Sequence, residues 1–244
     1  MNSQYWIAVA LVIMYIYDSA HLLYYNEIIF IRTFSSWKFK ATNGNPFVAG
    51  RWFFIKNIIA PHSYMCRLAW NPNDNVRHSI HKRKKAYELR LTCLMPVRYV
   101  SIILFIITLL LLAALLVKVN DEIFLAILSG IYSCVLIIVL IIFMLRKKIR
   151  LELKEFLKIA FEFVACPAFA INATSRLSQY ITTGIPALTF AIENLDQKSN
   201  KTLANIISLR ISDVIDFLDE DDVRRLNYIK YKKQVEEILL CYRD

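Results

Sequence analysis

The sequence is poor in the residues from which nucleotide-binding loops are built. Its 244 residues include four glycines and six prolines. Phosphate-cradling loops depend on closely spaced glycines, because only glycine lets the backbone come close to the phosphates. The chain also has no P-loop, no G-x-S-x-G, no H-E-x-x-H and no protein-kinase signature. These absences argue against the common nucleotide-dependent and hydrolytic enzymes, and we predict no cofactor.

Cysteine is scarce as well, with five residues in no regular spacing. An odd number without any C-x-x-C gives no disulfide framework. One metal hypothesis exists, because His62-x3-Cys66 and His78-x2-His81 bring four nitrogen or sulfur ligands together within 20 residues. Tetrahedral zinc accepts such a set. The spacing matches no familiar zinc module, so we predict no metal and keep the set as a weak alternative.

Charge is missing from two long runs. Tyr99–Val117 has 19 residues and Ile123–Leu145 has 23, all uncharged. At about 1.5 Å per residue these runs are roughly 28 and 35 Å long as helices, enough to cross a hydrocarbon core of about 30 Å. The five residues 118–122 between them allow only a tight turn. The sequence therefore predicts an antiparallel transmembrane hairpin.

The amino-terminal apolar run is shorter, because Tyr5–Tyr17 gives 13 residues before Asp18 and His21 interrupt it. We predict an uncleaved helix from Asn2 to Leu23 that forms a third span. A signal peptide is the competing interpretation, but no Lys or Arg precedes the run. Asp18 and His21 are spaced to share one helical face, so they are our candidates for an intramembrane polar pair. The alternative places both at the inner membrane interface.

Basic residues predict the orientation. Residues 32–98 hold 13 Lys and Arg against two acids, a balance of +11, and Arg146-Lys147-Lys148 directly follows the last span. The positive-inside rule places 32–98 and 146–244 in the cytosol, with Met1 and the hairpin turn outside. We therefore expect a multi-pass protein of the bacterial inner membrane.

The basic region alternates aromatic and cationic residues, a composition that suits the headgroup layer of an anionic inner leaflet. Packing against the carboxy-terminal region is one alternative, and single-stranded nucleic acid, which we consider unlikely, is another. A second basic cluster follows at 82–85, where fixing the topology is the simpler role. The predicted lipid contacts are Trp37, Lys38, Lys40, Arg51, Trp52, Lys56, Lys82, Arg83, Lys84 and Lys85.

The predicted fold class is an all-α integral membrane protein with three transmembrane helices and a helical cytosolic carboxy-terminal region. Four zones follow from these patterns: an anchor at 1–31, a basic aromatic-rich loop at 32–98, the hairpin with its basic exit at 99–150, and helices at 151–244. Within the last zone, Arg176 is the only charge between Phe163 and Ile192. That stretch is expected to be the buried middle of a helical domain or a segment that contacts the membrane.

Three function classes fit these features. The first is a non-enzymatic subunit or scaffold of a multiprotein membrane assembly, for which secretion or transfer machinery is one setting. The second is a pore or transporter component that uses Asp18 and His21. The third is a lipid-modifying enzyme at the cytosolic membrane interface. We favour the first, because no catalytic constellation accompanies the spans.

Overall fold

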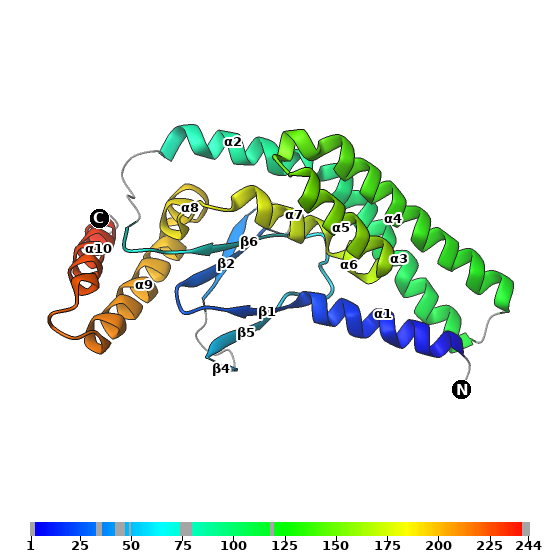
Figure 1. Cartoon of the computed structure of the whole chain (residues 1–244), viewed down its shortest axis with the longest axis horizontal. Coiled ribbons are helices and arrows are strands. Elements are labelled where there is room, and N and C mark those ends of the chain that lie inside the picture. Colours follow the sequence, from blue (N-terminus) through cyan, green and yellow to red (C-terminus); the bar gives the residue numbers. More distant parts are fainter. Residues whose placement is uncertain are drawn as a thin grey trace. The chain divides into compact units, whose positions relative to one another are not determined.

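The computed structural model describes residues 3–32, 36–41, 47–48, 50–73, 80–117 and 120–240. The fold is mostly helical, and it includes short strands (Figure 1). The helices are α1 Ser3–Ser19, α2 Ile80–Cys93, α3 Met95–Val117, α4 Asp121–Ile149, α5 Leu153–Ala165, α6 Pro167–Ile171, α7 Ala173–Thr182, α8 Ala187–Asn194, α9 Gln197–Phe217 and α10 Val223–Leu240. The strands are β1 Ala20–Leu23, β2 Glu27–Arg32, β3 Trp37–Lys40, β4 Phe47–Val48, β5 Arg51–Ile55 and β6 Tyr64–Ala69.

The strands correct the all-α prediction. They form two small sheets, with strand orders β1-β5-β4 and β3-β2-β6. In the second sheet β2 and β3 are antiparallel, with Phe30 opposite Phe39 and Ile31 opposite Lys38. Aromatic and β-branched residues favour strands, and alternation with a period of two directs successive side chains to opposite faces. The alternating aromatic and cationic residues that we attributed to the membrane surface are therefore, in β3, the pattern of a strand.

The chain divides into two compact units. The first comprises residues 1–21, 55–65 and 87–181, and the second comprises residues 22–54, 66–86 and 182–244. The first unit contains α1, α3, α4, α5, α6 and most of α7. The second contains β2, β3 and α8–α10.

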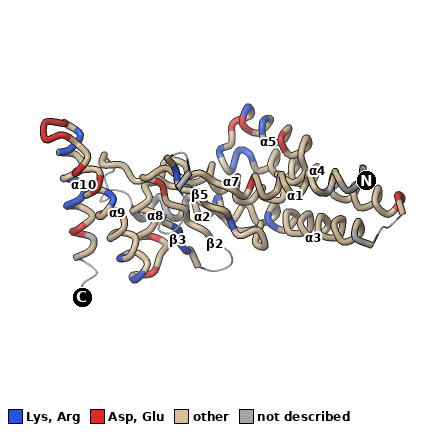
Figure 2. Tube along the Cα trace, turned by 90° about the horizontal axis from the view of Figure 1, so that it is seen from below, with Lys and Arg blue, Asp and Glu red and all other residues tan. Residues whose placement is uncertain are grey.

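The predicted hairpin is present in the first unit, where α3 and α4 pack against each other (Figure 1). Two helical segments, Met95–Leu115 and Asp121–Ile149, are long and apolar enough to cross a membrane. Charged residues are absent from most of the length of both helices (Figure 2). Leu104 of α3 and Ile138 of α4 are fully buried.

The first helix differs from its prediction. α1 ends at Ser19, not Leu23, because Ala20–Leu23 is the strand β1, which pairs with β5. With 17 residues, α1 has a length of roughly 26 Å, slightly less than the hydrocarbon core of about 30 Å. A third span therefore stays a prediction.

The ends of α4 explain how the chain turns. Asn120 caps the amino end by accepting a hydrogen bond from the Ile123 amide at 3.1 Å. At the other end Arg150 adopts a left-handed conformation with φ 58°, and the Leu151 amide donates to the Arg146 carbonyl at 2.9 Å. The chain reverses there, so α5 packs back on α4, with the rings of Phe143 and Phe156 5.5 Å apart.

The short helix α6 lies where the helices of this unit meet. It packs against α1, α3, α4 and α5. Its small and apolar sequence, Pro-Ala-Phe-Ala-Ile, suits such a crowded position, and Pro167, Ala168, Ala170 and Ile171 are buried. Pro167 occupies the first turn of α6, where its missing amide hydrogen costs no helical hydrogen bond. The segment after α5 is thus the buried middle of this unit.

In the second unit an aromatic cluster joins the β2–β3 pair to α8. The ring of Phe190 lies 4.9 Å from the rings of both Phe30 and Trp37. Its contact with Trp37 is edge-on, an arrangement that aromatic quadrupoles favour. Elsewhere in this unit α9 and α10 pack as a helical hairpin, and Trp70 stacks on the buried Tyr231.

Candidate functional site

Charged and polar side chains gather inside the first unit, although its helices are mainly apolar. Buried ions are costly unless paired and hydrogen-bonded, and groups of buried titratable side chains are often functional sites. We call it the ionic cluster. Its members are Asp18, Ser19, Lys56, Glu162, Asn172, Ser175 and Arg176.

Lys56 is the most deeply buried charged residue of the ionic cluster, with 2% of its surface exposed. Its ammonium group donates to the Pro61 carbonyl at 2.8 Å and to the Ser175 hydroxyl at 3.0 Å. A third, longer hydrogen bond reaches Asn172 Oδ1 at 3.3 Å. The three donors of an ammonium group are therefore all used. The backbone amide of Lys56 also donates to the Ser19 carbonyl at 2.9 Å, which holds the residue against the end of α1.

Asn172 connects the lysine to the carboxylate of Asp18. Its Oδ1 accepts from Lys56, while its Nδ2 donates to Asp18 Oδ2 at 2.9 Å and to Ser19 Oγ at 3.1 Å. Because an amide has an acceptor at one end and donors at the other, this geometry fixes which end faces each charge. The position between α6 and α7 thus requires a residue that can bond both a cation and an anion.

Arg176 closes the other side of the ionic cluster. Its Nε donates to Asp18 Oδ1 at 2.9 Å, and one terminal nitrogen bonds the same oxygen. The other terminal nitrogen donates to Glu162 Oε2 at 2.5 Å. Its guanidinium also lies 4.9 Å from the ring of Phe169, within the range of a cation–π interaction. The arginine therefore holds α1, α5 and α7 together through two carboxylates.

The electrostatics of the ionic cluster are nearly balanced. Two carboxylates face Lys56 and Arg176, so the cluster is neutral when the lysine is protonated. Burial lowers the pKa of Lys56 to about 7, although the charge of Asp18 acts in the opposite direction. For Arg176, burial also acts to lower the pKa, but the bonds and charges of Asp18 and Glu162 outweigh it and raise the pKa above its usual value.

These pKa values limit what the ionic cluster can do chemically. Arg176 stays charged and acts as a fixed tie, because its pKa is raised further. Lys56 exchanges a proton near neutral pH, so the net charge of the cluster changes between zero and −1 there. Asp18 has both oxygens engaged and a side chain only 7% exposed. The arrangement fits a cluster that holds the helices in place and contains one group that titrates near neutral pH. It fits an open ion path less well.

Asp18 and His21 are not a pair on one helical face. Asp18 lies in the last turn of α1, whereas His21 belongs to strand β1. The predicted spacing depended on a helix that continues to Leu23, and the helix ends two residues before His21. The partners of Asp18 are Arg176 and Asn172, 158 and 154 residues away along the chain.

Two of the predicted lipid contacts are wrong. Lys56 is buried in the ionic cluster, because three oxygen acceptors replace water around its ammonium group. Trp37 is only 6% exposed and packs edge-on against Phe190 of α8. Packing against the carboxy-terminal region, our alternative for these residues, describes Trp37 correctly.

The other predicted lipid contacts remain predictions. Lys38 and Lys40 are exposed on β3, while Arg51 and Trp52 on β5 are partly exposed. The guanidinium of Arg51 lies 4.1 Å from the centre of the Tyr24 ring. Lys82, Arg83, Lys84 and Lys85 belong to α2, and their side chains lie outside the described part of the structure.

The metal hypothesis gains no support from the residues that the structure describes, among which no group of three or more His, Cys, Asp or Glu could hold an ion. Burial raises the pKa of the Cys66 thiol to about 12, which disfavours the thiolate that zinc binds. Burial, with the charges of Arg98 and Lys56, lowers the pKa of His62. His78 and the side chain of His81 lie outside the described residues.

Sequence reasoning missed most of the ionic cluster. Glu162, Asn172 and Ser175 carry no motif, and the partner Lys56 of Asn172 and Ser175 lies more than 100 residues away in the chain. Arg176 did give a signal, because it is the only charge between Phe163 and Ile192. A single arginine in such a stretch needs a buried carboxylate, and Asp18, which interrupts an apolar helix, was the natural candidate.

Comparisons of the chain with protein-family models, with curated proteins and with solved structures found no match.

Proposed function

We propose that this protein is a non-enzymatic integral membrane subunit of a multiprotein assembly, embedded through the α3–α4 hairpin with α1 as a third span. The observation that carries the proposal is the apolar surface that the hairpin exposes. Such a surface is unfavourable in water and calls for lipid or for other transmembrane helices. Its exposed residues include Tyr99, Ile103, Ile106, Leu109 and Leu110 on α3, and Leu125, Leu136, Ile137, Leu140 and Met144 on α4.

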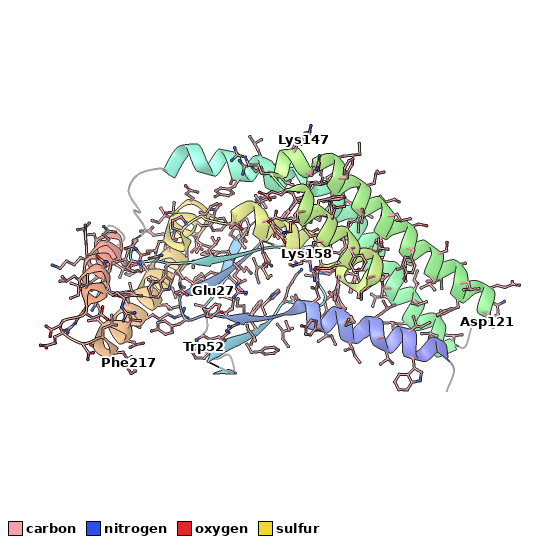
Figure 3. All side chains as sticks on the ribbon, in the orientation of Figure 1. Glu27, Trp52, Asp121, Lys147, Lys158 and Phe217 are labelled. Carbon is pink, nitrogen blue, oxygen red and sulfur yellow. The ribbon has the colours of Figure 1, made fainter. Side chains whose placement is uncertain are left out.

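A second exposed apolar surface supports a role in protein binding. At the junction of α9 and α10, Phe217 is 91% exposed, and Val223 and Leu226 are exposed as well. The turn between these helices is acidic, with Asp219, Glu220, Asp221 and Asp222 in succession. Figure 3 shows Phe217 at the end of α9. Exposed aromatic and apolar residues beside charges are typical of protein-binding surfaces. We therefore propose that this end of the α9–α10 hairpin binds a protein partner.

The ionic cluster supports a structural subunit over a pore. A transport function for Asp18 requires a carboxylate that can meet an ion or a proton carrier. Here Arg176 and Asn172 occupy both of its oxygens. We therefore propose that the cluster fixes the end of α1 against α6 and α7, and that transport through Asp18 and His21 is the less favoured alternative.

The orientation follows from the same proposal. With Arg146, Lys147 and Lys148 in the last turn of α4, the positive-inside rule places that end in the cytosol. Asp121 at the other end of α4 then lies outside, and α9–α10 lies in the cytosol of a bacterium. Secretion and transfer machines are assemblies that contain subunits of this kind.

Cysteine labelling in intact and permeabilised cells tests the membrane topology. In a variant whose five cysteines are replaced by serine or alanine, a cysteine at Asp121 should react with an impermeant maleimide in intact cells. A cysteine at Lys201, exposed on α9, should react only after permeabilisation. A cysteine at Ser3 separates the three-span from the two-span arrangement, because it lies outside only if α1 crosses. Labelling of all three positions without permeabilisation overturns the topology.

The subunit role has its own test. A photo-crosslinking amino acid at Phe217 or Val223 should give a discrete larger product in cells, and the same product should co-purify in mild detergent. A crosslinker at Lys201, which is polar and exposed on α9, is the matched control and should give none. A monodisperse monomer of 28.5 kDa without a crosslinked product contradicts the subunit proposal.

A further inference from the structure

Helix α5 exposes an apolar stripe that the α3–α4 hairpin does not explain. Its side chains divide into three sectors around the helix. Phe156, Ile159 and Phe163 are buried in the first unit. The charged residues Lys154, Glu155, Lys158 and Glu162 form a second sector. The third sector is apolar and exposed, and consists of Leu153, Leu157, Phe161 and Val164.

The third sector is continuous along the helix. Its spacings of four, four and three residues place the side chains within roughly 80° of one another, at 100° per residue. Phe161 is 75% exposed, and Leu153 and Leu157 are more than half exposed. A helix that only covered the core of a water-soluble domain would show polar residues in this sector. The stripe therefore indicates an apolar environment on a second side of α5.

The stripe lies on a helix that packs directly against the apolar helix α4. Because the chain reverses at Arg150, α5 runs back along the last turns of α4. Phe143 of α4 is about half exposed and contacts Phe156 in the buried sector of α5, so apolar side chains of α4 and α5 lie next to each other at this corner. Whatever environment covers the carboxy-terminal half of α4 also reaches α5.

Cations gather at this corner. The α4–α5 corner contains Arg146, Lys147, Lys148 and Arg150, and α5 adds Lys154 and Lys158. Figure 3 shows Lys147 at the end of α4 opposite Asp121, and Lys158 further along the returning chain. Lysines on such a helix can lay their alkyl stems along apolar surface and keep the ammonium groups among headgroups. This combination of an apolar stripe and flanking lysines is typical of helices at an anionic membrane surface.

We propose that α5 is a membrane-contacting helix, with its stripe against acyl chains and the cations of the α4–α5 corner against anionic lipid headgroups. Because α5 returns along α4, Phe161 lies deeper in the leaflet than Leu153. The carboxylate of Glu162, which α5 carries near that deeper end, is bonded to Arg176 and so enters the membrane region as part of an ion pair. The inference rests on the proposed membrane insertion of α4.

Depth-dependent fluorescence in vesicles tests this inference. Single cysteines at Leu153, Leu157, Phe161, Lys158 and Leu136 of the cysteine-free full-length protein are labelled with an environment-sensitive dye. The protein is reconstituted in phosphatidylcholine vesicles with or without phosphatidylglycerol. Lys158, adjacent to Leu157 and exposed in the charged sector, is the matched control. Leu136, exposed in the middle of α4, reports whether that helix is inserted.

We expect dyes at Leu157 and Phe161 to show blue-shifted emission, quenching by spin-labelled lipid and loss of quenching by iodide. The dye at Lys158 should remain accessible to iodide. Phosphatidylglycerol should increase the difference in iodide accessibility between the two faces of α5, because its anionic headgroups attract the cations. Quenching of the Phe161 dye should be stronger with a deeply placed spin label, and that of a Leu153 dye with a shallow one.

Other outcomes identify which assumption fails. If Leu136 is in lipid but Leu157 and Phe161 are quenched by iodide, α5 is not in the membrane and this inference is wrong. If iodide quenches the dyes at all positions including Leu136, the proposed membrane insertion of α4 is wrong, and this inference is wrong with it. Dyes at Leu157 and Phe161 that are shielded from both quenchers contradict lipid contact and indicate a protein surface instead.

Discussion

Arg176 donates two hydrogen bonds to a single oxygen of Asp18, which precedes it by 158 residues. One residue interrupts an otherwise apolar amino-terminal helix, and the other is the only charge in a 30-residue stretch. Each would be costly alone in an apolar environment, and together they bring the end of α1 to α7. This pair is the centre of the ionic cluster.

The first prediction concerns the Asp18–Arg176 pair. Asp18→Asn should lower the free energy of unfolding by about 2–4 kcal/mol, because it leaves a largely enclosed guanidinium with only Glu162 as a charged partner. Thermal unfolding in detergent provides the measurement. Arg176→Gln should cost a similar amount, and the double variant should cost much less than the sum. Additive effects would show that the two side chains are not coupled.

The second prediction concerns the pH dependence of stability at Lys56. The folded protein releases this proton near pH 7, whereas the unfolded chain holds it up to 10.5. Between these values the unfolded state binds more protons, so stability rises with pH. Lys56→Met should remove this increase. The free energy of unfolding of wild type minus that of the variant should therefore become more positive from pH 7 to pH 10. Lys201→Met, at an exposed position on α9, is the control and should leave the pH profile of wild type unchanged.

The third prediction concerns the aromatic cluster of the second unit. Phe190 is fully buried between Phe30 and Trp37, so Phe190→Ala should lower the free energy of unfolding by about 3–5 kcal/mol. Near-ultraviolet circular dichroism should also weaken, because Trp37 loses its edge-on partner. Phe217→Ala removes the same atoms from an exposed site and should change stability by less than about 0.5 kcal/mol. Equal effects of the two substitutions would contradict the packing at Phe190.

The fourth prediction concerns Ser178, whose side chain bonds the backbone of Met65 in strand β6. Ser178 Oγ donates to the Met65 carbonyl at 2.7 Å and accepts from the Met65 amide at 2.9 Å, in a buried position. Ser178→Ala leaves both backbone groups without this partner and should lower the free energy of unfolding by about 2 kcal/mol. Ser208→Ala, on the partly exposed side of α9, is the control. Faster hydrogen exchange at the Met65 amide should accompany the loss, and unchanged exchange there would contradict the prediction.

The α3–α4 helical hairpin could be predicted from the sequence because its signal is local. Nineteen and 23 successive uncharged residues form helices from their own composition, and a five-residue link leaves only an antiparallel arrangement. Asn120, Asp121 and Glu122 at one end of α4 and Arg146–Lys148 at the other match the helix dipole, which also depends on position in the sequence alone.

The strands were missed because two patterns overlap. Trp37-Lys38-Phe39-Lys40 has the alternation of a half-buried strand and also the composition of a membrane interface. The partner strand decides between them, since β2 pairs with β3 and Trp37 then meets Phe190. No rule local to residues 37–40 contains that information.

The sequence by itself determined the two apolar helices of the α3–α4 hairpin and the distribution of basic residues, because each depends on neighbours a few positions away. Only the tertiary structure decided which isolated charges are buried and which residues they contact. Lys56 stands in an aromatic, basic segment, yet it is buried because Pro61, Asn172 and Ser175 supply the oxygens that water would otherwise provide. Asp18 meets Arg176 across most of the chain for the same reason. A buried charge needs partners that are close in space. The position of the charge in the sequence does not determine where in the chain those partners occur.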